Sequence, residues 1–173
     1  MGNTYLGTND VDKIIMTISP PLGPLGIAVA SVITQLLPAN SGYTFPFTVD
    51  AKGPGTYATA AMNVEQNTFT SGSDGSVVGN VSSDYSGTIM ITVMQYSRTS
   101  SLFAACLLAQ RVGLDFLFDC NIVDLASTVK YSGKQCRVAG FPSRPFSSDA
   151  AAMLEYKILV TELTPREIAF TGF

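Results

Sequence analysis

Apolar and polar residues alternate with a period of two along much of the chain, a pattern that predicts a mainly β protein. The clearest case is the segment 88–96, in which Ile89, Ile91 and Val93 share one face of the expected strand. The opposite face alternates threonine with methionine and is only half polar. We therefore expect this strand to be covered on both of its sides.

Several other segments have β-type composition and end at proline or glycine. Pro46 restricts one of them to a sheet edge or a bulge, because proline has no N–H to donate to a neighbouring strand. Residues 52–56 are expected to form a turn, and the Gly-, Ser- and Asp-rich residues 70–87 are expected to form a loop. The further expected strands are 11–18, 27–37, 43–49, 60–69, 115–123 and 152–163, the last with Tyr156, Ile158 and Val160 on one face.

One helix is expected, with Thr99 or Ser100 as its N-cap and Gly113 at its end. The residues between are apolar around the whole circumference, so the helix must be buried on most sides. It is covered either by a neighbouring subunit or by the open end of a barrel, and these two arrangements are compatible.

A hairpin is expected around Ser132-Gly133, with these two residues as its turn. In that register Val129 pairs with Cys136, and the opposite face is polar. The register also places Cys120 far from Cys136. The polar face comprises Thr128, Lys130, Gln135 and Arg137.

The 173 residues predict one domain, 1–173, with an N-terminal arm of about 1–10 and a loosely ordered C-terminal tail of about 165–173.

Charge is scarce and unevenly distributed along the chain. Charged residues make up 13% of the chain, against a usual share of about 25%. The segment 14–49 has none. Because charge depletion marks interface cores, we expect an extensive homo-oligomeric interface in addition to a buried core.

The composition excludes several functional classes. The chain has no His, so it has no Ser-His-Asp triad and no His-based metal site. Its net charge of −3 with ten Lys and Arg disfavours tight nucleic-acid binding. The apolar segment 22–37 is shorter than the roughly 20 residues of a membrane span, so no stable membrane insertion is expected. The scattered carboxylates and the absence of phosphate-binding motifs predict no enzyme and no cofactor.

Two candidate sites for metal or redox chemistry are weak. Asp74 and Asp84 suggest a calcium loop, but two carboxylates at this spacing do not match one, and we expect no metal. The cysteines Cys106, Cys120 and Cys136 are odd in number. They act either as reduced small hydrophobes or as cross-links between neighbouring copies in an oxidising medium.

Several short motifs follow one another along the chain. They are Glu65-Gln66-Asn67-Thr68-Phe69, Gly72-Ser73-Asp74-Gly75, Ser86-Gly87-Thr88, Arg98-Thr99-Ser100-Ser101 and Leu154-Glu155-Tyr156-Lys157-Ile158. In this order, over residues 10–163, the chain resembles the tail-tube proteins of contractile-tailed bacteriophages. It departs from that family at residues 19–51, which form a longer and more apolar segment than expected.

The resemblance implies a β-sandwich or barrel with one flanking helix, whose strands join a continuous inner barrel in a hexameric ring. Stacked rings would form a hollow conduit for phage DNA and the tape-measure protein inside a contractile sheath. Baseplate or initiator and tail terminator proteins would be further partners. The subunit would be assembled in the bacterial cytoplasm and reside in the virion tail. An acidic lumen would let DNA slide without sequence-specific binding.

Interface residues are expected in the loop 70–87, in the region 43–60, at the termini and on the apolar helix. They are Phe45, Phe47, Asp74, Asp84, Leu102, Phe103 and Leu107, with Cys106, Cys120 and Cys136 as possible inter-subunit cysteines.

Other functions remain open alternatives. A tube-initiator or baseplate ring protein of the same fold would form rings but no long tubes. A monomeric β-sandwich glycan-binding module would stay soluble and bind sugars through its aromatic side chains. A hydrolase that uses carboxylates is the residual enzyme alternative.

Overall fold

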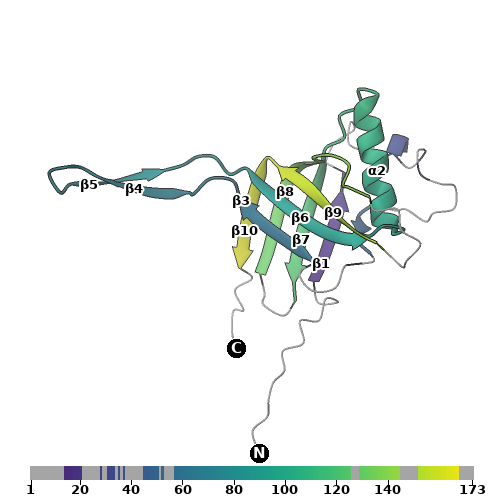
Figure 1. Cartoon of the computed structure of the whole chain (residues 1–173), viewed down its shortest axis with the longest axis horizontal. Coiled ribbons are helices and arrows are strands. Elements are labelled where there is room, and N and C mark those ends of the chain that lie inside the picture. The colour runs from purple at the N-terminus through teal and green to yellow at the C-terminus, as the bar shows by residue number, and fades with distance from the viewer. Residues whose placement is uncertain are drawn as a thin grey trace, which may run out of the picture.

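A projecting β-hairpin and a flanking helix lie at opposite ends of a curved antiparallel sheet in the computed structural model (Figure 1). The structure describes residues 14–20, 28, 31–33, 35, 37, 45–50, 52, 57–125, 129–144 and 152–167. The protein is mainly β, as the alternation predicts. Its elements are β1 Ile14–Ser19, β2 Phe47–Thr48, β3 Ala58–Met62, β4 Asn67–Ser71, β5 Val77–Val81, β6 Gly87–Met94, α2 Arg98–Arg111, β7 Phe118–Asp124, β8 Val129–Val138, β9 Met153–Val160 and β10 Glu162–Glu167.

The sheet has the strand order β2-β1-β7-β8-β9-β6-β3, and β10 pairs with β8 beside this path. Strand β8 connects the two halves of the sheet. Its residues between Lys130 and Cys136 pair with β7, whereas Arg137 and Val138 pair with Leu159 and Ile158 of β9. The sheet can therefore fold over one core, which gives the sandwich or barrel architecture with one flanking helix.

The core lies between the inward faces of the two halves. Ile89, Ile91 and Val93 of β6 are all 0% exposed, which confirms the predicted face. Tyr156 of β9 is also buried, as are Leu154, Ile158 and Val160 of the same strand. The second face of β6 is different: Met90 and Met94 are 39% and 37% exposed. The expectation of cover on both sides is therefore wrong for a single chain.

Helix α2 begins two residues earlier than its predicted N-cap. Ser97 is the N-cap, and its Oγ accepts a hydrogen bond from the Ser100 N–H at 3.0 Å. Thr99 instead donates its hydroxyl to Asp50 Oδ1 at 2.7 Å, and the Thr99 N–H donates to the same oxygen at 3.1 Å. The left-handed Gly113 (φ 85°) follows the last turn, as predicted. The structure thus supplies the cover for this apolar helix from the end of the sheet.

The described residues of the predicted strand 27–37 are not in a strand. Ala28, residues 31–33 and Gln35 are helical. Ile33 and Leu37 are buried whereas Ser31 and Gln35 are exposed, which is the spacing of a helix with one face on the core. The β-branched composition of the segment was misleading because burial on one helical face outweighs the propensity of single residues.

The predicted turn at Ser132-Gly133 is also wrong. Strand β8 runs through both residues, and the hairpin is formed by β7 and β8, with Cys120 opposite Gly133. A Cβ at Gly133 would lie 3.0 Å from Cys136 Sγ and from a Val160 methyl carbon. This glycine therefore permits a close approach within the core and does not form a turn. Cys120 and Cys136 consequently lie on adjacent strands, contrary to the expected separation.

Three other boundaries differ from the sequence prediction. Residues 60–69 divide into parts of β3 and β4, and the predicted loop 70–87 contains strand β5. The predicted strand 152–163 breaks at Thr161 into β9 and β10, and β10 includes residues 165–167 of the predicted tail. Strand β2 stands at the end of the sheet order, as Pro46 predicts. The predicted arm 1–10 and the tail residues 168–173 lie outside the described residues.

Candidate assembly surfaces

The β4–β5 hairpin projects from the barrel and is exposed along its whole length (Figure 1). Its turn is well formed: the Gly72 N–H donates to the Ser76 carbonyl at 2.7 Å, and Gly75 has the left-handed φ of 82°. Asp74 Oδ1 accepts hydrogen bonds from the Ser76 hydroxyl at 2.6 Å and from the Ser76 N–H at 3.0 Å. These bonds hold the pKa of Asp74 below its usual value, so the carboxylate stays charged.

One face of this hairpin is apolar. Opposite pairs share a face in an antiparallel ladder, and the register pairs Phe69 with Gly79, Asn67 with Val81 and Ser71 with Val77. Phe69, Val77 and Val81 therefore point to the same side, where they are 77%, 64% and 79% exposed. A two-stranded hairpin is at best marginally stable alone in water. An uncovered face of this kind marks an interaction surface.

Side-chain hydrogen bonds hold the base of the hairpin. Gln66 Nε2 donates to the Asp84 carbonyl at 2.7 Å, and Asn63 Nδ2 donates to Ser86 Oγ at 3.0 Å. The Ser86 N–H donates to Asp84 Oδ1 at 2.9 Å, and this bond lowers the pKa of Asp84. These contacts join the two segments that connect the hairpin to β3 and to β6.

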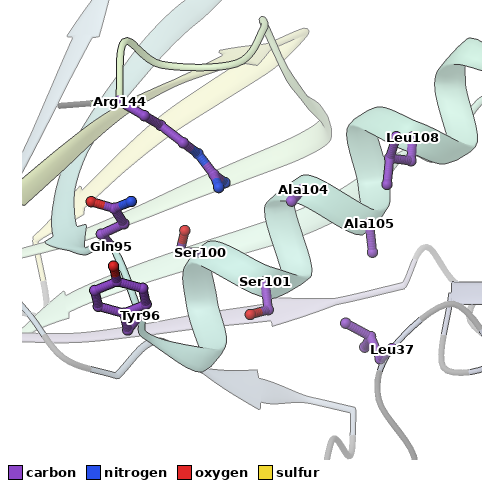
Figure 2. Close-up of a pocket in the computed structure, with 9 residues that line it drawn as sticks. All are labelled: Leu37, Gln95, Tyr96, Ser100, Ser101, Ala104, Ala105, Leu108 and Arg144. Carbon is purple, nitrogen blue, oxygen red and sulfur yellow. The ribbon is translucent and has the colours of Figure 1, made fainter. Parts of the chain in front are cut away.

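A groove of about 370 Å³ runs along α2 at the other end of the molecule (Figure 2). Tyr96 and Leu108 are 86% and 51% exposed at this groove. The side chain of Arg144 extends toward the N-terminal half of the helix, near Ser100 (Figure 2). The remaining lining residues are Leu37, Gln95, Ser101, Ala104 and Ala105. The lining of the groove thus combines apolar side chains, several uncharged polar side chains and one cationic side chain.

The predicted interface residues fall into two groups. Leu102, Phe103 and Leu107 of α2 are buried within the chain's own core. Phe47 is buried as well, and Phe45 is half-buried against the same core. The structure therefore explains the apolar character of all five without a second subunit.

Asp74 and Asp84 are exposed, and an interface role for them stays a prediction. The prediction did not include Phe69, Val77 and Val81, the residues of the apolar hairpin face. Their alternation with polar residues across an Asp-Gly turn is the sequence signal that could have identified the hairpin and its face.

The cysteines Cys106, Cys120 and Cys136 are free and buried. Burial raises the pKa of all three thiols, that of Cys136 to about 12. A cross-link between copies requires accessible thiols, so this burial favours the alternative in which the cysteines act as small hydrophobes.

The described residues include no group of three or more His, Cys, Asp or Glu side chains that could hold a metal ion. Within the same part of the chain, every buried side-chain nitrogen and oxygen has a hydrogen-bond partner. None of the helices there has the length and the apolar character needed to cross a membrane.

Comparisons with known proteins give structural matches only. No family model matches this sequence, and no curated protein matches it. A chain of the anti-feeding prophage cap, the tube-terminating cap of AFP, is 14% identical with a TM-score of 0.46, over 66% of this chain and 81% of that chain. A chain of the sheath–tube complex of the extracellular contractile injection system PVC, in its extended state, is 10% identical with a TM-score of 0.48, over 88% of each chain.

The match with a TM-score of 0.50 is a chain in the sheath/tube terminator of the same injection system in its extended state. It is 10% identical and covers 87% of this chain and 92% of that chain. The protein therefore shares the fold of a chain from a contractile injection system terminator.

Proposed function

We propose that this protein is a structural subunit of a contractile tail-like tube, in which copies form rings that stack into a hollow conduit. The observation that carries the proposal is the uncovered apolar face of β4–β5, formed by Phe69, Val77 and Val81. An uncovered apolar surface of this kind is typical of an interaction site, and the fold shared with a chain of a contractile injection system supports a role in such an assembly. Its role is structural and not catalytic.

The finer details of this role follow from the sequence resemblance. The chain acts as a single tail-tube domain, and its rings are hexameric. Its partners are further copies, a sheath protein, baseplate or initiator proteins and a terminator. The lumen conducts the tape-measure protein and phage DNA, and the assembled tube is part of a virion.

A ring protein at one end of the tube is the second candidate. The solved structure that shares the fold belongs to a sheath/tube terminator, and this observation favours a cap or initiator ring of the same architecture. Such a protein would form isolated rings that do not elongate.

A monomeric glycan-binding module has weaker support. Its aromatic side chains would have to share one binding platform. The strongly exposed Phe69 and Tyr96 belong to the hairpin and to the start of α2, at opposite ends of the molecule (Figure 1).

Negative-stain electron microscopy of the purified full chain, with and without reductant, tests the proposal. We expect hollow tubes, and because the cysteines are buried we expect them to persist under reductant. Isolated rings would select the terminal-ring alternative. Featureless small particles at every concentration would overturn the proposal.

A further inference from the structure

The apolar hairpin face and the α2 groove are separated along the longest axis of the molecule (Figure 1). The two surfaces therefore cannot cover each other within one chain. If the hairpin of one copy enters the groove of the next, the contact is heterologous. Repeated heterologous contacts generate rings when the rotation closes and helical filaments when it does not.

The apolar face of the hairpin presents three apolar side chains, and the hairpin carries one charge. Asp74 is the only charged residue between residues 67 and 81, and it is at the turn. Its Oδ1 accepts hydrogen bonds from the N–H and the hydroxyl of Ser76. The carboxylate thus meets any surface that receives the end of the hairpin.

The groove presents the complementary features. Leu37, Ala104 and Ala105 contribute apolar side chains to its lining, and the side chain of Arg144 extends toward Ser100 and Ala104 (Figure 2). Helix α2 contains two arginines and no acidic residue. Asp50, which lies beside the N-terminus of α2, accepts hydrogen bonds from Thr99. Arg144 is the one charged residue among the described residues that line the groove, and its charge is opposite in sign to that of Asp74 at the hairpin turn.

We propose that the β4–β5 hairpin of one copy docks into the α2 groove of a second copy, with its apolar face over the helix and Asp74 paired with Arg144. This inference rests on the proposed function, since it names the surface that receives the hairpin during assembly. Phe69 and Val77 cover Tyr96 and Leu108, which are otherwise exposed. The ion pair fixes the register of a contact whose area is mainly apolar.

A charge exchange tests the pairing. The variants are Asp74→Lys, Arg144→Glu and the double variant, with assembly measured by sedimentation across a concentration series and by negative-stain microscopy. Each single variant is expected to raise the critical concentration for assembly at least about tenfold, because it places like charges together in a covered contact. The double variant is expected to recover most of this loss.

Two controls separate a pairing effect from a general effect of charge. Asp74→Asn keeps an oxygen that accepts the Ser76 hydrogen bonds. Any loss of assembly in this variant therefore reports the missing charge and not a disrupted turn. Glu65→Lys makes the same change of charge on an exposed residue just outside the hairpin, and it should neither block assembly nor restore Arg144→Glu. Unchanged melting temperatures of the variants would show that each still folds.

Photo-crosslinking identifies the receiving surface directly. A benzoylphenylalanine at position 69 is expected to cross-link to residues 95–108 or to Arg144 of an isotopically distinct copy. Cross-links to the hairpin of another copy, or to the region of Met62, Tyr85 and Leu163 at the hairpin base, would overturn the proposal. A wild-type chain that assembles while the double variant shows no recovery would refute this pairing but leave the tube function intact, whereas a wild-type monomer would refute both.

Discussion

Two pairs of antiparallel strands in this chain follow the same alternation and end in opposite environments. In β6 and β9 the apolar face, with Ile91 and Tyr156, is completely buried. In β4 and β5 the apolar face is exposed, and Phe69 and Val81 on it are each more than three-quarters exposed. The alternation specifies that a face will be covered, but not whether this chain or another one covers it.

The buried face and the exposed face should therefore contribute to different properties, the first to the stability of one chain and the second to assembly. Residues that cover the barrel should determine the free energy of unfolding of one chain. Residues on the hairpin face should leave this free energy almost unchanged and should determine association between copies.

The largest expected effect is a matched pair of Phe-to-Ala variants. Phe103 is 0% exposed, and its ring centroid lies 5.0 Å from that of Tyr156. Phe103→Ala should lower the free energy of unfolding by about 3–5 kcal/mol. Phe69→Ala should lower it by no more than about 0.5 kcal/mol, as is usual for exposed positions. Urea unfolding under conditions that keep both proteins monomeric measures the two values, and equal losses would contradict the separation.

A smaller effect is expected at the contact between the segment before β3 and helix α2. Asp50 Oδ1 accepts hydrogen bonds from the hydroxyl and the N–H of Thr99. Asp50→Ala removes a charged acceptor from a half-buried position, and it should cost about 1–3 kcal/mol of unfolding free energy. Chemical denaturation measures this loss. A variant as stable as the wild type would show that these hydrogen bonds contribute nothing net.

Alkaline pH should weaken the barrel and not the hairpin. The pKa of Cys136 is raised to about 12, mainly by burial. The neutral thiol is therefore stabilised by folding, and this contribution is complete below the unfolded pKa and lost as the pH rises through the folded value. The midpoint of unfolding should therefore decrease as the pH rises from about 9 to about 12. These limits are the pKa of the Cys136 thiol in the unfolded chain and in the folded protein. Cys136→Ala should reduce this part of the pH dependence, and an unchanged profile would contradict it.

The smallest effect is expected at the hairpin turn under acidic conditions. Hydrogen bonds from Ser76 lower the pKa of Asp74, so the bonds favour the charged form. This contribution is present above the unfolded pKa and is lost as the pH falls through the lower, folded pKa. The Ser76 amide resonance should shift on acidification before the barrel unfolds, and Asp74→Asn should abolish that shift. A Ser76 amide that shifts only together with the barrel would contradict a locally stabilised turn.

The elements with strong local signals could be predicted from the sequence. The alternation of Ile89, Ile91 and Val93 indicates β6 and its buried face, and Gly113 indicates the end of α2. Pro46 correctly assigns its segment to a sheet edge. In each of these cases, one residue type or one hydrophobic period is compatible with only one kind of local structure.

The errors arose where local composition is ambiguous. Gly133 permits either a turn or close packing, and only the neighbouring Cys136 and Val160 decide between them. The polar residues around Asp74 are typical of a loop and also of a hairpin turn. The candidate groove was not predictable, because Arg144 and α2 approach each other only through the tertiary fold.

The central claim is that another copy of this chain covers the apolar hairpin face. Sedimentation and negative-stain microscopy of the wild-type chain beside Phe69→Asp test it most directly, with the melting temperature of each recorded. We predict rings or tubes for the wild type and folded monomers of nearly unchanged melting temperature for the variant. Assembly of Phe69→Asp at wild-type concentrations, or a wild-type chain that stays monomeric throughout, would contradict the claim.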